Sequence, residues 1–363
     1  MGGPAFADFL ITLAAQQPLR SWVLVPAQDD ALEFVARHCQ RLSTSYRLVT
    51  PDWEILRWAH DKRLLYQVAA ELLIPYPRTW YPTGPDDLDG LEISLPAIIK
   101  PSISIGLQYA LGRKVLPVRS RAQLAESYQV AIGILSPEAL MVQEQVPGNG
   151  RTQYSAVVFC KDGRVLAGMT ARRSRQYPVD YGLASTFVEA MEVPPLLALA
   201  DRLVSRLRLS GMVEVEFKHD HRDGEYKLLD INVRPWGWHT LCMASGLDFP
   251  SMLYDDAIGA PIAPAVPRYG RRWRRLVTDL PAAWQELSRG MSSPVDVLGS
   301  LLARAVPSVL DWRDPMPLVG DLVVVLRRAI TARHRPRSWT ASDQPPAWSS
   351  TPRQPTRVTG RSE

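Results

Sequence analysis

The chain contains little cysteine and little lysine. Its three cysteines, Cys39, Cys160 and Cys242, are odd in number and far apart, and they lack the spacing of a metal site or a disulfide framework. Such cysteines are typical of buried thiols in a reducing compartment, so we expect a cytoplasmic protein. Six lysines stand against 36 arginines. Codon usage alone can produce that balance, and it therefore says little about function.

The sequence also lacks long hydrophobic runs. The apolar run near the C-terminus, at 322–326, is far shorter than the roughly 20 residues that cross a bilayer, so no membrane span is expected. The first 27 residues have no basic segment ahead of the apolar stretch 6–15, and a signal peptide is not expected either. A chain of 363 residues that is 46% hydrophobic and 22% charged is typical of a globular protein with two or three domains.

The net charge of +5 raises the question of a nucleic-acid partner. Much of the excess arginine lies in residues 268–275 and after residue 327. Residues 333–363 combine arginine with proline, serine and threonine, and they cannot bury enough apolar surface to offset the entropy lost on ordering. We therefore predict a disordered tail at 333–363 and no nucleic-acid partner.

Hydrophobic periodicity divides the rest of the chain into regions, and the expected fold class is α/β, or α+β. A short apolar run at 21–26 precedes a helical pattern at 31–41, and one further helix is expected at 53–73. The turn-rich segment 83–90 marks the first boundary. The predicted regions are an N-terminal α/β domain at 1–90, a strand-rich region at 91–262 and a helical C-terminal extension at 263–332.

The strand-rich region alternates short apolar segments with turns. Its helical patterns lie at 121–132 and 195–207. Strands are predicted at 97–100, 113–118, 140–145, 153–160, 165–170, 213–217 and 227–233.

The last two of these strands form a predicted hairpin with one polar face. Side chains alternate across a strand, so Glu214 and Glu216 share a face in the first strand, as Asp230 and Asn232 do in the second. The apolar side chains fill the alternate positions: Val213, Val215 and Phe217 in the first strand, and Leu229, Ile231 and Val233 in the second.

The turn decides which polar side chains meet. A two-residue turn would mix apolar and charged faces, whereas a three-residue loop at 222–224, with Gly224 in the left-handed conformation of a bulge, keeps the apolar faces together. The predicted register pairs Glu216 with Asp230 and Glu214 with Asn232.

This register sets two carboxylates directly opposite each other, with Cβ atoms roughly 5 Å apart. Like charges at that distance repel, and a cation relieves the repulsion. Mg²⁺ suits the arrangement because it binds one or two carboxylates together with the oxygens of a nucleotide phosphate. A solvated polar face that tolerates a weak repulsion is the alternative that alternation alone leaves open.

At these residues the sequence resembles the ATP-grasp superfamily, whose domain typically closes with a Glu-Phe strand, a turn and an acidic-x-Asn-x-Arg strand. Here the matching segments are 215–217 and 229–234. The run Arg-Pro-Trp-Gly-Trp-His at 234–239 is similar to a branch described as predicted carboxylate–amine ligases or carboligases. The resemblance extends from about Asp61 to Gly259. It implies that residues 91–262 are an ATP-grasp domain of two subdomains that clasp ATP.

The resemblance also implies positions for the nucleotide. Lys62, Lys100 and, with fewer matching neighbours, Lys114 correspond to lysines on the phosphates. Glu144 corresponds to the acid that reads the adenine amino group, and Val146 to the backbone beside the adenine edge. Gln153 corresponds to the ribose contact.

The remaining positions concern the metal and the reaction. Glu216, Asp230 and Asn232 correspond to ligands of Mg²⁺, with Mn²⁺ as an alternative metal. Arg234 corresponds to a residue beside the transferred phosphate and the substrate carboxylate. Arg175, one of several arginines in segment 172–175, is expected to clamp an anionic substrate or the γ-phosphate.

The implied activity is ligation of a small carboxylate to an amine, or another nucleophile, through an acyl phosphate. A kinase that releases a phosphorylated small molecule and a regulatory protein that binds nucleotide without turnover stay open as alternatives. Three features depart from the family pattern: Asp230 is shorter than the usual Glu, Gln153 replaces an acid, and segment 102–112 has only two glycines.

Overall fold

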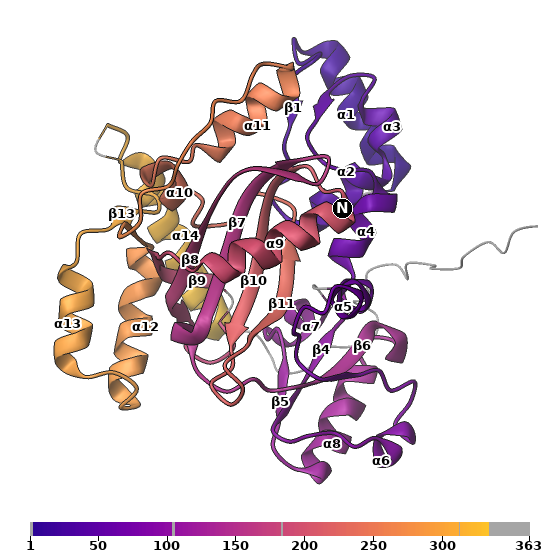
Figure 1. Cartoon of the computed structure of the whole chain (residues 1–363), viewed down its shortest axis with the longest axis vertical. Coiled ribbons are helices and arrows are strands. Elements are labelled where there is room, and N and C mark those ends of the chain that lie inside the picture. The colour runs from indigo at the N-terminus through magenta and orange to yellow at the C-terminus, as the bar shows by residue number, and fades with distance from the viewer. Residues whose placement is uncertain (1–2, 104–105, 183, 312, 334–363) are drawn as a thin grey trace, which may run out of the picture. The chain divides into compact units, whose positions relative to one another are not determined.

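The computed structural model describes residues 3–103, 106–182, 184–311 and 313–333. It divides into two compact units, residues 1–322 and 323–363 (Figure 1). The described part of the second unit is the last stretch of helix α14 (Met316–Arg333). The tail predicted to be disordered lies, beyond Arg333, outside the described residues.

The N-terminal region contains a two-stranded parallel sheet, β1 (Val23–Leu24) with β2 (Arg47–Leu48). Its helices are α1 (Pro4–Gln16), α2 (Asp29–Arg37) and α3 (Cys39–Leu42). Ala7, Phe34 and Leu42 are buried together between them. The predicted order of a strand followed by a helix is confirmed at β1 and α2.

The single helix predicted at 53–73 is wrong, because the chain forms two helices, α4 (Trp53–His60) and α5 (Lys62–Glu71). Asp61 separates them. Its backbone is extended, and its carboxylate accepts a hydrogen bond from the backbone N–H of Arg63, which makes it the N-cap of α5. Lys62 is thereby fixed at the first position of a helix.

A four-stranded sheet follows, with the order β3-β6-β4-β5 among the described residues. Its strands are β3 (Thr79–Trp80), β4 (Ala97–Pro101), β5 (Leu116–Val118) and β6 (Leu140–Glu144). The helices of this region are α6 (Asp87–Gly90), α7 (Gly106–Leu111), α8 (Arg121–Ile132) and a 3₁₀ turn at Pro137–Ala139. Leu124 and Tyr128 of α8 pack against Ile99 and Val142 of the sheet, forming a separate small core.

The larger sheet has seven strands among the described residues, in the order β11-β10-β7-β8-β9-β12-β13. Its strands are β7 (Gln153–Lys161), β8 (Arg164–Tyr177), β9 (Ala184–Ala190), β10 (Gly211–His219), β11 (Tyr226–Asn232), β12 (Arg272–Arg274) and β13 (Val306–Pro307), and a 3₁₀ turn at Gly150–Thr152 precedes them. Helix α9 (Pro194–Leu207) crosses one face of this sheet (Figure 1). Leu203 of α9 belongs to the same buried core as Val158 and Val213.

The other face of the large sheet carries a second core, in which Val157 and Met212 pack with Trp236, Trp238 and further side chains from the segment after β11. The helices of this part are α10 (Thr240–Ala244), α11 (Phe249–Ile258), α12 (Leu276–Ser288) and α13 (Pro294–Leu302). Because side chains alternate along β10, Met212, Glu214 and Glu216 all project from this second face.

Three expectations about strands need correction. β8 continues seven residues past the predicted end at 170, because Ala171 to Tyr177 pair with β9, which the sequence pattern did not predict. The C-terminal extension is not purely helical, since β12 pairs with β9 through a buried Trp273. Among the described residues, no helix is both long and apolar enough to cross a membrane.

Candidate active site

The β10–β11 hairpin carries the predicted pairing at its functional end. Glu214 faces Asn232 and Glu216 faces Asp230 across the two strands. These four residues are called the carboxylate row below. The prediction of the register at the row is confirmed.

The turn that produces this register differs from the predicted one. Beyond Glu216 the pairing shifts by one residue, so that Phe217 faces Leu228, and the loop is longer by one residue. Gly224 takes the predicted left-handed conformation, with φ of 76°. The shift places Leu228 in the core beside Ile231, where Leu229 was expected. A bulge next to the row thus compensates for the longer turn.

Within the carboxylate row, Asn232 holds the two glutamates together. Its Nδ2 donates to Glu214 Oε2 at 3.2 Å and to Glu216 Oε1 at 3.1 Å. Glu214 is 3% exposed and also accepts a hydrogen bond from Ser155 Oγ at 3.0 Å. Burial and the neighbouring charge of Glu216 raise the pKa of Glu214 to about 7. Glu214 was not predicted as a site residue, although its alternation with Glu216 pointed to this face.

Lys62 brings a cation to the row from the start of α5. Its Nζ lies 2.8 Å from Asp230 Oδ2, and its backbone N–H donates to the carbonyl of Ser102. Burial acts to raise the pKa of Asp230, but Lys62 and Lys100 outweigh it, and that pKa is lowered. The structure therefore brings together Lys62 and Asp230, which are separated by more than 160 residues in the sequence.

Lys100 lies at the end of β4 and is 9% exposed. Its Nζ donates to the hydroxyl of Tyr66 at 3.4 Å. Burial and the charge of Lys62 lower the pKa of Lys100 to about 7, against the opposing charges of Asp230 and Glu216. Lys100 thus lies within electrostatic reach of the carboxylate row.

Lys114 is an exposed residue, and its ammonium experiences the charges of Glu216, Arg173, Asp230 and Lys62. Those four groups belong to the row or contact it directly. The three predicted phosphate lysines are therefore grouped around one set of carboxylates, although they come from α5, β4 and the segment before β5.

Arg173 is a site residue that the sequence reasoning did not single out. It lies opposite Gln153 in the β7–β8 pair, with Nη1 3.4 Å from Gln153 Oε1. Its Nη2 lies 3.3 Å from Glu216 Oε2. The signal that would have found it is the β7–β8 register, since Glu216 pairs with Ser155 next to Gln153 in the same sheet.

Arg175 does not lie in the carboxylate row, contrary to the expectation that it contacts substrate. It is 2% exposed and contacts Asp279 at 3.0 Å and Glu286 at 3.2 Å, both on α12. The register of β8 against β9 shifts between Arg173 and Arg175, so their partners are the adjacent residues Val188 and Phe187. Adjacent residues in a strand point to opposite faces, and the irregularity therefore separates the two arginines.

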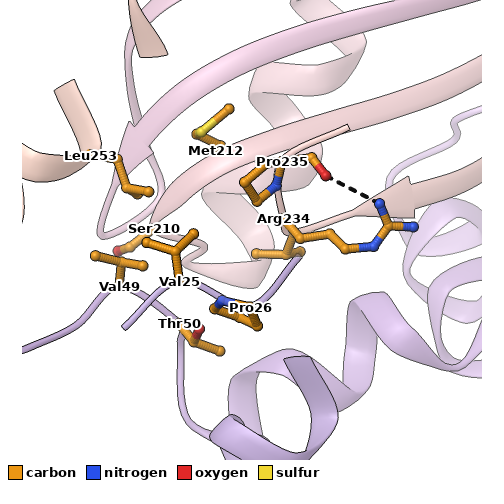
Figure 2. Close-up of a pocket in the computed structure, with 10 residues that line it drawn as sticks. Val25, Pro26, Val49, Thr50, Ser210, Met212, Arg234, Pro235 and Leu253 are labelled. Atoms are coloured by element: carbon orange, nitrogen blue, oxygen red, sulfur yellow. Dashed lines mark hydrogen bonds between the residues drawn. The ribbon is translucent and has the colours of Figure 1, made fainter. Parts of the chain in front are cut away.

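Arg234 follows β11 and joins the row to the N-terminal region. Its guanidinium forms two contacts with Asp29 of α2, at 2.5 and 3.2 Å, and its Nη2 lies 3.4 Å from Asn232 Oδ1. Figure 2 shows the side chain extending away from Val49 and Leu253, with a further hydrogen bond to the carbonyl of Pro235. Asp29 was not predicted, because no local pattern links residues so far apart.

The predicted adenosine residues lie on β6 and after it. Glu144 is 6% exposed, and its carboxylate accepts from the backbone N–H of Arg78 at 3.0 Å and contacts Lys227 and Arg222 at 3.3 Å each. Val146 is buried. Glu144 is therefore held by partners from the turn of the β10–β11 hairpin, and an adenine contact uses only the capacity that remains.

The donor chemistry of the row fits a hard divalent cation, because every group in it offers oxygen. Among the described residues, no group of three aspartate, glutamate, histidine or cysteine side chains is arranged to hold a metal ion. Lys62 and Arg173 instead contact the two facing acids. The two carboxylates and the amide oxygen of Asn232 remain the candidate ligands.

Comparison with known proteins agrees with this geometry. Residues 136–276 match the family model described as ATP-grasp in the biosynthetic pathway with Ter operon. A curated relative, D-aspartate ligase from Enterococcus faecium, is 20% identical over 272 residues, which are 70% of this chain and 64% of the relative. The chain thus spans just under two thirds of that relative.

The fold is shared with solved structures at low sequence identity. The biotin carboxylase domain of Hydrogenobacter thermophilus 2-oxoglutarate carboxylase, crystallised with MgADP, ADP and bicarbonate, matches with a TM-score of 0.61 at 16% identity, covering 74% of this chain and 60% of that one. L-amino acid ligase from Bacillus licheniformis matches with a TM-score of 0.53 at 16% identity, covering 70% and 61%. The fold is an ATP-grasp fold. Together with the family match, it places the chain in the ATP-grasp superfamily.

Proposed function

We propose that the protein is an ATP- and Mg²⁺-dependent ligase that joins a small carboxylate to an amine, or another nucleophile, through an acyl phosphate. The observation that carries the proposal is the carboxylate row, with Lys62 and Lys100 brought to it from two other elements. A row of facing acids next to buried lysines combines the two charges that a magnesium–triphosphate complex requires.

Glu216, Asp230 and Asn232 are the residues that would hold the metal. The raised pKa of Glu214 supports this assignment, because it reports unrelieved repulsion from Glu216. When bound, Mg²⁺, or Mn²⁺ in its place, would supply positive charge to the phosphate oxygens. Lys62, now paired with Asp230, would then be released toward the phosphates.

The remaining nucleotide contacts are assigned by position. Lys62, Lys100 and Lys114 would neutralise phosphate oxygens as point charges. A phosphate beside Lys100 would favour its charged form and thus oppose the effect of burial on its pKa. Glu144, Val146 and Gln153 would contact the adenosine, with Gln153 also positioned by Arg173.

Two arginines would act on the reacting groups. A carboxylate is a poor electrophile, and transfer of the γ-phosphate converts it into an acyl phosphate that an amine can attack. Arg234 would stabilise charge on the phosphate and on the oxyanion of the attack, since its guanidinium lies beside Asn232. We assign the second role to Arg173, which contacts Glu216, in place of Arg175.

The relatives support the class of reaction. D-aspartate ligase and L-amino acid ligase are by name ligases of amino acids. The biotin carboxylase domain was crystallised with MgADP, which supports the nucleotide and the metal. We further propose the domain boundaries 1–90, 91–262 and 263–332, and a cytoplasmic location, for which the free cysteines Cys39, Cys160 and Cys242 are suited.

The experiment is a substrate panel followed by release of ADP and phosphate. We expect release with Mg²⁺ and ATP only when an acid and an amine are both present, together with a condensed product. A stable phosphorylated product without an amine would identify a kinase instead. Nucleotide binding without turnover across the panel would identify a regulatory protein, and either result would overturn the ligase proposal.

A further inference from the structure

An apolar cleft lies next to the carboxylate row and has no role in the proposed chemistry so far. It has a volume of about 650 Å³ and is bordered by β1, by α11 and by the segment after β11. Its walls include Trp22, Val25, Met212, Leu253 and Tyr254. This volume falls within the range that small molecules occupy in proteins.

The cleft is joined to the site by a narrow crevice. The crevice shares Val25, Met212, Pro235 and Leu253 with the cleft and is also bordered by Arg234 (Figure 2). Met212 is two residues before Glu214 on the same face of β10, which is about 7 Å along the strand. The cleft therefore begins one side-chain step beyond the carboxylate row.

The chemistry of the walls excludes a charged ligand group. None of the described residues that line the cleft is an aspartate, glutamate, lysine or arginine. Two aromatic side chains, Trp22 and Tyr254, border it while 60% and 55% exposed. Aromatic side chains left open to water in a concave site are typical of binding surfaces for apolar groups.

One polar group is fixed at the wall. The Nδ1 of His239 lies 2.8 Å from the carbonyl oxygen of Trp236. A carbonyl oxygen can only accept, so Nδ1 carries the proton and Nε2 of the neutral ring is an acceptor. A ligand in this cleft would thus be apolar, with at most one N–H or O–H donor to satisfy.

We propose that this cleft binds the apolar side chain of one of the two substrates, while the reacting group of that substrate lies at the row. The inference rests on the proposed ligase function and specifies its substrate class: an acid or an amine that bears an aromatic or branched hydrocarbon group. The acid and the amine are two sources of the same chemistry, and separate probes distinguish them.

The test is calorimetric binding to the full chain in the presence of Mg²⁺ and ADP. The acid probes are 3-phenylpropionate and propionate, and the amine probes are 2-phenylethylamine and ethylamine. We expect one phenyl probe to bind at least about tenfold more tightly than its short counterpart, because the ring transfers from water to the cleft. The pair that shows this gain identifies which substrate carries the hydrocarbon group.

Matched variants locate the gain. Trp22→Ala is expected to remove it, and Trp284→Ala, which truncates a 69% exposed tryptophan of α12, is expected to retain it. Tyr254→Ala provides a second variant of the cleft at an exposed position. The inference is overturned if neither phenyl probe exceeds its short counterpart, or if Trp22→Ala and Trp284→Ala have the same effect. Failure of the ligase proposal reads differently: the phenyl gain persists while no acid–amine pair releases ADP.

Discussion

Two clusters of charged side chains use the same β-sheet in opposite ways. In the network around Arg175, the carboxylates of Asp279 and Glu286 each meet a guanidinium, and all three side chains are at most 6% exposed. In the carboxylate row, acids face acids, and Glu214 is raised in pKa by Glu216. The first cluster is paired within itself, whereas the second still favours an added cation. Charge and burial alone do not mark a functional site, but unrelieved repulsion does.

The largest expected effect tests the paired cluster. Arg175→Met leaves the buried Asp279 with only Arg274 nearby, at 3.3 Å, and should lower the free energy of unfolding by about 3 to 5 kcal/mol. Chemical denaturation measures the loss. MgADP affinity of the folded variant should be unchanged. If the variant keeps its stability and loses nucleotide binding, the assignment of the two clusters is reversed.

The next effect tests the row. Glu216→Gln removes one facing carboxylate at constant size and should reduce Mg²⁺-dependent ADP release by about 100-fold. Its thermal midpoint should stay near that of the native chain. The control is Glu126→Gln on α8, an exposed position outside the site. Equal losses of stability and activity in Glu216→Gln would favour a purely structural polar face.

Lys100 gives a pH-dependent contrast. Its pKa is about 7 in the folded chain, against an ordinary value of 10.5, so the unfolded chain binds more protons between those values. In the absence of nucleotide, its contribution to stability is therefore full above pH 10.5 and is lost as the pH falls toward 7. The difference in unfolding midpoint, native minus Lys100→Met, should rise from pH 7 to pH 9. Lys161→Met, at an exposed lysine, should show no such trend.

The smallest expected effect concerns Glu214. Its folded pKa of about 7 exceeds the ordinary 4.5, so the folded chain binds more protons between those values. The contribution is present below pH 4.5 and is lost as the pH rises through 7. With chelator present, Glu214→Gln should gain in midpoint relative to the native chain from pH 5 to pH 8. A constant difference across that range would contradict the repulsion from Glu216.

Local patterns predicted the parts of the site that one hairpin contains. Alternation and the faces of the strands determine that Glu216 meets Asp230, and the pairing holds although the predicted turn was one residue too short. Periodicity predicted the strands of Lys100 and Glu144 in the same way.

Contacts set by irregular or distant geometry escaped prediction. Arg173 and Arg175 are two residues apart in one basic segment, and only a register shift against β9, a strand that had not been predicted, separates their surroundings. The pair Arg234 and Asp29 joins segments about two hundred residues apart, which no local pattern relates. Asp61 could have been read as a helix cap, but periodicity across it favoured a single helix.

The most direct test of the carboxylate row as a magnesium–nucleotide site is the thermal shift produced by ADP with Mg²⁺. A ligand that binds the folded chain raises its midpoint in proportion to the logarithm of concentration over Kd. We predict a clear rise for the native chain and for Arg175→Met, which chelator abolishes, and little rise for Glu216→Gln. The account is contradicted if Glu216→Gln shows the same Mg²⁺-dependent rise as the native chain.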